Sequence, residues 1–172
     1  ADDAATTAED VPVSIPVLAN DSDADEDPLT VITVTDPQHG AVTWNAQTRA
    51  FDYVPAADWS GDDSFTYEIT DGDGGTSAAT VSVSVDPVND APSFTKGLDQ
   101  AVLEDAGAQT VANWATGISA GPVDESGQVL NFIVANDTNG LFAVQPAIAA
   151  DGTLTYTLAD NANGPATVTV QL

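Results

Sequence analysis

Carboxylates are the side chains of this sequence best suited to chemistry, and they gather in short clusters. Asp86, Asn89 and Asp90 lie close together in the chain, and Pro87 and Pro92 restrict the backbone that carries them. Carboxylate, amide and backbone carbonyl oxygens suit Ca²⁺, which takes about six to eight of them at roughly 2.3–2.6 Å. The segment therefore predicts a joint at which calcium binds.

Further acidic residues stand next to the expected strands and extend the candidate ligand set. They are Glu9, Asp23, Asp25, Asp62 and Asp63 in the first half, and Glu104, Asp105, Asp124 and Glu125 in the second. In an antiparallel sandwich, loops separated by an odd number of strands lie at the same end. By that count Asp62 and Asp63 come near residues 86–90, and Asp124 and Glu125 face the same residues. No cluster of His or Cys that could hold zinc is present.

The charge balance makes a cation plausible. The 172 residues include 27 Asp and Glu but only two basic residues, Arg49 and Lys96, so the formal net charge is -25. Two like charges about 4 Å apart repel by roughly 1 kcal/mol in water and by more near a protein surface. The carboxylates must therefore be solvated, protonated or bound to metal. A purely solvated acidic coat is the simpler alternative, and this charge disfavours nucleic acid and anionic membranes as partners.

Cysteine is absent, so no disulfide can brace the chain, and a bound metal would be the substitute. No apolar run approaches the roughly 18 residues of a membrane-spanning helix, so no membrane insertion is expected. The first residues do not form a signal peptide, and without an initiating Met the sequence reads as a piece of a longer chain.

Short segments of period-two alternation are the elements that must position these carboxylates. In the first half they cover 11–17, 29–35, 41–44, 50–54, 64–70 and 76–85, with turn residues between them. Strands at this spacing, without a helical stretch, predict an antiparallel β-sandwich. Its expected core is Ile15, Val17, Leu29, Val31, Val34, Trp44, Phe51, Tyr53, Phe65, Tyr67, Val81, Val83 and Val85.

The second half repeats this plan. The pair Glu104 and Asp105 recurs 95 residues after Glu9 and Asp10, and strands are expected at 130–134, 152–156 and 166–170. The first half closes with an acidic glycine turn and a final strand that have no counterpart in the second. We therefore expect two tandem Greek-key sandwiches, 1–90 and 91–172, the second lacking its last strand. Its open edge would be filled by a continuation of the chain or by another chain.

Catalysis is not expected. His39 is the single histidine and lies in a turn, with no nucleophile elbow nearby. A pair of glycosidase carboxylates would need a substrate cleft that a two-module chain does not offer. Asp21, Asp23 and Asp25 fit the first three ligand positions of an EF-hand, but Glu26 stands where that motif needs glycine.

Taken in order, these motifs resemble a known family. Glu9, the 23–25 Asp-Ala-Asp, the 62–63 Asp-Asp, the 71–74 Asp-Gly-Asp-Gly and the 86–94 joint resemble the ordered calcium motifs of cadherin repeats. More closely, the chain is similar to the bacterial cadherin-like and Ig-like repeats found in tandem in large RTX-type surface adhesins. The resemblance implies a seven-strand Greek-key sandwich, calcium at the module junction, an extracellular and cell-surface location, and a role in adhesion or biofilm formation.

The resemblance also assigns ligands residue by residue. Glu9, Asp62, Asp86 and Asp90 match cadherin ligand positions, and Glu104 with Asp105 match as the first-strand pair of the second repeat. Asn89 and Asp90 stand where cadherins have the sequence Asp-Asn-Asp-Asn with a different spacing. Asp124 and Glu125 stand where the family pattern has Asp-x-Asp. Asp23 and Asp25 fall at the far end of the first module.

Two binding functions are compatible with these assignments. In the first, calcium makes the tandem repeat rigid, and the repeat extends and presents an adhesin. In the second, the chain is a calcium-dependent recognition module that binds a polysaccharide or another copy of itself. Trp59 and Trp114, both in expected loops, could stack on a sugar ring, although such tryptophans usually plug a core.

Overall fold

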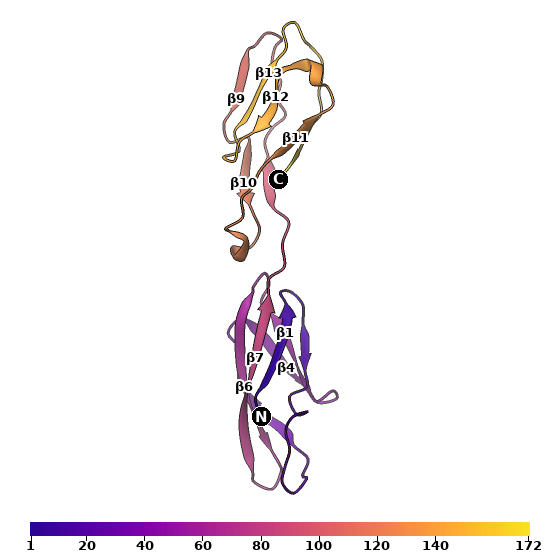
Figure 1. Ribbon diagram of the computed structural model, residues 1–172, viewed down its shortest axis with the longest axis vertical. Coiled ribbons are helices and arrows are strands. Elements are labelled where there is room, and N and C mark those ends of the chain that lie inside the picture. The colour runs from indigo at the N-terminus through magenta and orange to yellow at the C-terminus, as the bar shows by residue number, and fades with distance from the viewer. The chain divides into compact units, whose positions relative to one another are not determined.

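The computed structural model describes all 172 residues, and almost all of its regular secondary structure is β-strand (Figure 1). The chain divides into two compact units, Ala1–Val88 and Asn89–Leu172. Two short 3-10 turns, η1 (Val123–Glu125) and η2 (Asn139–Leu141), are the only helical elements. Neither is long or apolar enough to cross a membrane.

The first unit is a sandwich of two sheets. One sheet has the order β1 (Asp3–Ala8), β7 (Thr76–Asp86), β6 (Gly61–Thr70) and β3 (Thr30–Val34), and the other has β2 (Val13–Ile15), β5 (Ala50–Pro55) and β4 (Gly40–Asn45). Six of these strands coincide with segments of alternating apolar residues, because one face of each sheet must be buried. The expected all-β sandwich is confirmed.

The first strand, β1, was not expected from the sequence, which placed the first strand at residue 11. Its residues, Asp-Ala-Ala-Thr-Thr-Ala, lack apolar alternation. The strand forms because it pairs along its whole length with β7, from Asp3 opposite Val81 to Ala8 opposite Asp86. That pairing is parallel, so the first sheet is mixed rather than purely antiparallel.

The core of the first unit is built from alternate residues of the long strands. Val81, Val83 and Val85 of β7 are 0–2% exposed, and they pack in one cluster with the aromatic rings of β5 and β6. Phe51 and Phe65 meet edge to face with ring centroids 5.3 Å apart. The expected core is wrong at Val34, which is 38% exposed. The reason is a register shift in β3 between Val31 and Thr33, which breaks the alternation at a sheet edge.

The second unit has shorter strands in three groups. They are β8 (Ser93–Lys96) with β10 (Ala115–Ser119), β11 (Ile133–Asn136) with β14 (Val168–Gln171), and β13 (Leu154–Leu158) between β12 (Phe142–Ile148) and β9 (Ala108–Val111). Five residues form its buried cluster, against ten in the first unit. The second core is therefore the smaller of the two.

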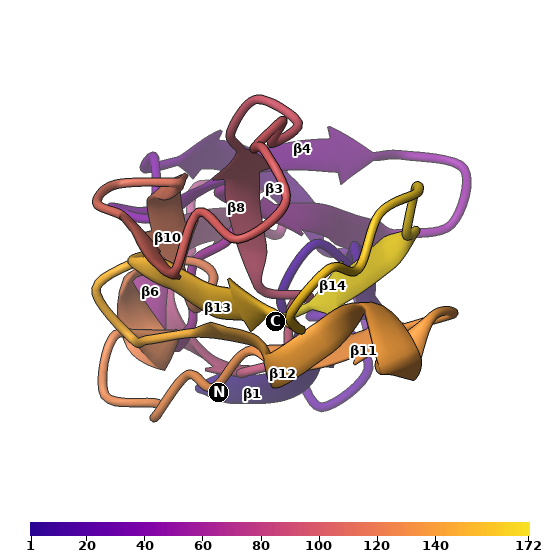
Figure 2. The same ribbon diagram turned by 90° about the horizontal axis from the view of Figure 1, so that it is seen from above.

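No strand of the second unit takes the place that β7 has in the first. There β7 lies between β1 and β6 and is hydrogen-bonded to both. In the second unit β14 pairs with β11 alone and β8 pairs with β10 alone (Figure 2). One edge of β14 thus has no neighbouring strand.

One buried carboxylate, that of Asp63, holds the first sandwich together at the start of β6. Its two oxygens accept hydrogen bonds from the N–H groups of Gln38, His39 and Ser64 and from the Tyr53 hydroxyl, at 2.8–3.0 Å. Burial opposes ionisation, but these donors outweigh it and lower the pKa of Asp63. The side chain is 7% exposed and serves the fold.

Replacing Asp63 tests this role. Asp63→Ala leaves a buried tyrosine hydroxyl and two turn N–H groups without an acceptor, so we expect a loss of about 2–4 kcal/mol in unfolding free energy. Asp62→Ala, at the exposed neighbouring position, should change it by less than about 0.5 kcal/mol. Chemical denaturation in chelator measures both.

The stability difference between the wild type and Asp63→Ala should also depend on pH. Because the pKa of Asp63 is lower in the folded state, its contribution is complete above the ordinary value of 3.8 and is lost as the pH falls through the folded value. The stability difference between wild type and Asp63→Ala should therefore shrink in acid. A difference that stays constant down to about pH 2 would contradict the assignment.

Candidate metal centre

Glu9 is a buried carboxylate of the first unit, placed where the chain leaves β1. Its backbone N–H donates to the Asp86 carbonyl at 2.9 Å, which ties it to the end of β7. One side-chain oxygen, Oε1, accepts a hydrogen bond from the Val88 N–H. The other, Oε2, is buried and has no hydrogen-bond partner, although the side chain is only 3% exposed.

Glu125 is the corresponding buried carboxylate of the second unit. It ends η1, it is 4% exposed, and its Oε1 accepts a hydrogen bond from the Asp90 N–H at 2.6 Å. Its Oε2 also has no partner. Gly121, at a φ of +151°, faces this carboxylate so closely that a Cβ there would collide with it. The backbone of the second unit thus makes room for the Glu125 side chain and supplies a donor for only one of its oxygens.

No basic side chain reaches either orphaned oxygen. Arg49 donates to the Leu29 carbonyl at 3.3 Å, and Lys96 pairs with Asp99. A buried carboxylate oxygen without a donor or a cation is costly, so each of these positions is electrostatically incomplete. A hard cation is the chemical complement of such an oxygen.

The donors present suit calcium in kind but do not form a complete cage. Nowhere in the chain do three or more His, Cys, Asp or Glu side chains come together as a metal site. A cation held by Glu9 or Glu125 would therefore draw most of its ligands from carbonyls, amides and water, which calcium accepts readily. The dense carboxylate cluster suggested by the sequence is not assembled.

The other expected ligands lie apart from these two glutamates or have other partners. The side chains of Asp25, Asp62, Asp86, Glu104 and Asp124 are exposed. Asp23 caps its own loop by accepting hydrogen bonds from the N–H groups of Asp25 and Asp27 at 2.8 and 3.2 Å, which lower its pKa. Asn89 accepts a hydrogen bond from Gln128, a residue that the sequence did not single out.

The glutamate and the aspartate of the repeated Glu-Asp pair have different roles. Asp10 and Asp105 both adopt a left-handed backbone, with φ of +59° and +62°. Asp10 accepts a hydrogen bond from the Asp58 N–H at 3.1 Å, and Asp105 accepts the equivalent bond from the Asn161 N–H at 2.9 Å. The aspartate is thus a structural tether in each unit, whereas only the first glutamate, Glu9, is buried.

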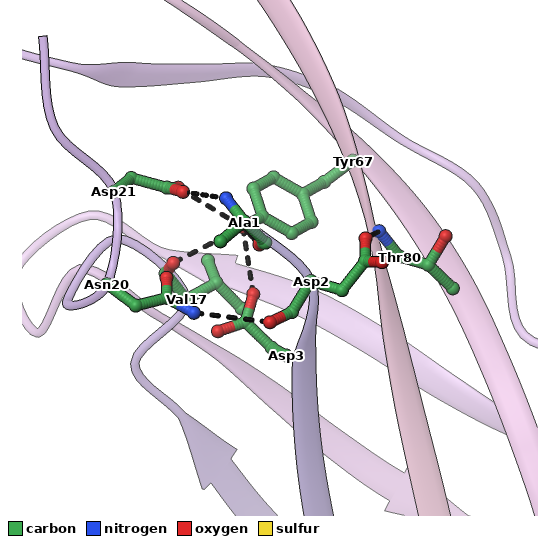
Figure 3. Close-up of polar contacts among 8 residues, drawn as sticks. All are labelled: Ala1, Asp2, Asp3, Val17, Asn20, Asp21, Tyr67 and Thr80. Carbon is green, nitrogen blue, oxygen red and sulfur yellow. Dashed lines mark hydrogen bonds and ion pairs between the residues drawn. The ribbon is translucent and has the colours of Figure 1, made fainter.

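An acceptor-rich cluster that the sequence did not indicate lies at the start of β1 (Figure 3). The buried Tyr67 hydroxyl has four acceptors within 2.9–3.4 Å: Asp3, Asp21 and the carbonyls of Ala1 and Val17. A single O–H can serve only one of them at a time. The Ala1 nitrogen lies against the Asp21 carboxylate. Burial raises the pKa of Asp3, the Tyr67 hydrogen bond opposes this shift, and the nearby Asp21 charge adds to it.

Both tryptophans proposed for sugar binding make contacts within the fold, and Trp59 remains partly exposed. Trp114 is 9% exposed, and its indole N–H donates to the Leu98 carbonyl at 2.9 Å. Trp59 stacks on His39 with ring centroids 4.3 Å apart and packs against the first core. Both rings are parts of the fold.

The cluster around Tyr67 yields a prediction for Asp3. Its raised pKa means that the ionised carboxyl weakens the fold above that pKa, and that the penalty disappears below the ordinary value of 3.8. Asp3→Asn should therefore raise the melting temperature at pH 7 by roughly 1–4 °C and have no effect near pH 3. Asp25→Asn, at an exposed site, is the control, and a lower melting temperature for Asp3→Asn at pH 7 would contradict the assignment.

Comparison with known proteins relates the first unit to a family. Residues 1–84 match the family model described as a bacterial Ig domain. No curated protein matches the chain. Among solved structures, an endo-fucoidan hydrolase of glycoside hydrolase family 107 is 15% identical, with 99% of this chain and 27% of that chain covered and a TM-score of 0.36. The human desmocollin-1 ectodomain is 11% identical, with 95% and 33% covered and a TM-score of 0.35.

These structural likenesses carry no argument about function, because both TM-scores are low and the chain spans only about a quarter and a third of the two proteins. The family match and the strand order agree on the architecture. The first unit is an Ig-like β-sandwich, and its residues 1–84 are similar to the bacterial Ig domain.

Proposed function

We propose that this chain is a calcium-binding tandem repeat of a bacterial surface adhesin, in which Glu9 and Glu125 are the principal carboxylate ligands. The observation that carries the proposal is the pair of buried carboxylate oxygens, one in each unit, that have neither a donor nor a basic partner. Each lies beside a backbone segment rich in Asp and Asn. The repeat would extend and present the adhesin for attachment or biofilm formation.

The residues of the chain define what each position does. In the first unit, Glu9 is fixed by the Asp86 carbonyl and the Val88 N–H, so its second oxygen keeps one orientation. In the second unit, the Asp90 N–H holds Glu125 in the same way. A bound calcium ion would supply the positive charge that the two basic residues do not provide.

Several properties support an extracellular location for this repeat. Bacterial Ig domains are typically surface modules, and the net charge of -25 suits a chain exposed to millimolar divalent cations. Extracellular modules hold calcium with dissociation constants of about 0.1–1 mM. Calcium at roughly 10 mM would then add about 1.4–2.7 kcal/mol of stability per site.

A calcium titration with matched variants tests the proposal. The wild-type chain should bind Ca²⁺ with a dissociation constant of about 0.1–1 mM by calorimetry and should melt several degrees higher in about 10 mM CaCl₂ than in chelator. Glu9→Gln and Glu125→Gln should each weaken one site about tenfold or more, because the charge that binds the cation is lost.

Glu104→Gln is the matched control, since Glu104 occupies the repeat position of Glu9 but is exposed. It should leave calcium binding unchanged. A melting temperature that responds to CaCl₂ no more than to NaCl of equal ionic strength would overturn the proposal, as would a Glu104→Gln effect equal to that of Glu9→Gln.

A further inference from the structure

The second unit contains counterparts of β1 and β6, the two strands that flank β7 in the first unit, but it has no counterpart of β7. In the first unit, β7 lies between β6 and β1, and three of its valines are almost fully buried. The counterpart of β6 is β14. The counterpart of β1 is the segment 98–103, because the 95-residue spacing that relates Glu9 to Glu104 relates 3–8 to 98–103.

In the second unit, neither counterpart has the hydrogen-bonded strand partner that β7 provides in the first unit. The strand β1 has no hydrogen-bonded neighbour other than β7, and the segment 98–103 forms no strand. Leu98 is 86% exposed and Val102 is 38% exposed. These exposed apolar side chains take the places of Asp3 and the buried Thr7 of β1.

A cavity of about 540 Å³ lies between these two elements. The segment 98–103 contributes Leu98 and Val102, β14 contributes Val168 and Val170, and β13 contributes Tyr156 and Leu158 to its lining. The side chains facing the cavity are thus mainly apolar, as the buried face of an inserted strand requires.

One buried polar group in this cavity has no partner. The Tyr156 side chain is 6% exposed, and its hydroxyl makes no hydrogen bond. Its counterpart in the first unit, Tyr53, donates to Asp63 at 2.9 Å. The 103-residue spacing from Asp58 to Asn161 and from Gly61 to Gly164 places Ala166 where Asp63 would be. The Tyr156 hydroxyl therefore lacks its acceptor, and an incoming backbone carbonyl could supply one.

We propose that the second unit binds one extended polypeptide strand, contributed from outside residues 1–172, in the cavity between β14 and the segment 98–103. The strand would run antiparallel to β14 and parallel to 98–103, as β7 does with β6 and β1. Its inward side chains are uncharged, β-branched and at alternate positions. Backbone hydrogen bonds to two edges would provide affinity, and the alternation would set the register.

A synthetic peptide with the sequence of β7, residues 76–86, is the probe. Added to the full chain, it should bind saturably at micromolar concentration and slow hydrogen exchange at β14 and at 98–103 by about tenfold. A peptide of the same composition, in which Val81 exchanges with Ser82 and Val83 with Ser84, should bind about tenfold or more weakly, because two of its three valines would face solvent.

Two substitutions at exposed leucines localise the interaction. Leu98→Asp should weaken peptide binding about tenfold or more, because a carboxylate would become buried, while the free chain keeps its melting temperature. Leu103→Asp is the matched control. Leu103 is 83% exposed and does not line the cavity, so its substitution should leave binding unchanged.

Three results would overturn the proposal. They are equal binding of the two peptides, absence of binding at about 1 mM peptide, and protection of β14 that depends on the concentration of the chain alone. The last would identify a second copy as the occupant.

Discussion

Buried carboxylates that must be neutralised without basic side chains are the constraint on which this structure depends. With 27 acidic and two basic residues, salt bridges cannot compensate them. The fold uses backbone N–H groups and tyrosine hydroxyls instead, most completely at Asp63, whose oxygens accept four hydrogen bonds. At Glu9 and Glu125 the backbone supplies a donor to one oxygen only, and this asymmetry distinguishes candidate ligands from structural carboxylates.

The two units use the same devices to different extents. Each begins with a Glu-Asp pair whose aspartate ties the chain to a later loop, and each places a tyrosine at the same point of its central strand. The first unit completes its sheet with β7 and buries ten residues in its core cluster, whereas the second has no such strand and buries five. The open edge and the cavity follow from the absence of a strand in that position, whereas the Tyr156 hydroxyl is unpaired because Ala166 stands where Asp63 would be its acceptor.

The sequence predicted those parts of the fold in which local pattern and burial agree. Alternating valines identified β7, and the aromatic residues of β5 and β6 were correctly assigned to the core. The strand β1 was missed because it depends on pairing with β7 rather than on its own pattern, and Val34 was misassigned because a register shift changes which side chains are buried. Among the acidic residues, the sequence could not separate Glu9 from Glu104, since burial depends on packing around each side chain.

The central claim is that Glu9 and Glu125 carry the ligand oxygens, and carboxyl ¹³C chemical shifts measured during a CaCl₂ titration test it most directly. The account predicts that the side-chain carboxyl signals of these two glutamates move together and saturate at millimolar calcium, while that of Asp63 stays fixed. Stationary signals at Glu9 and Glu125, with only a gradual and unsaturating drift at the exposed carboxylates, would contradict it.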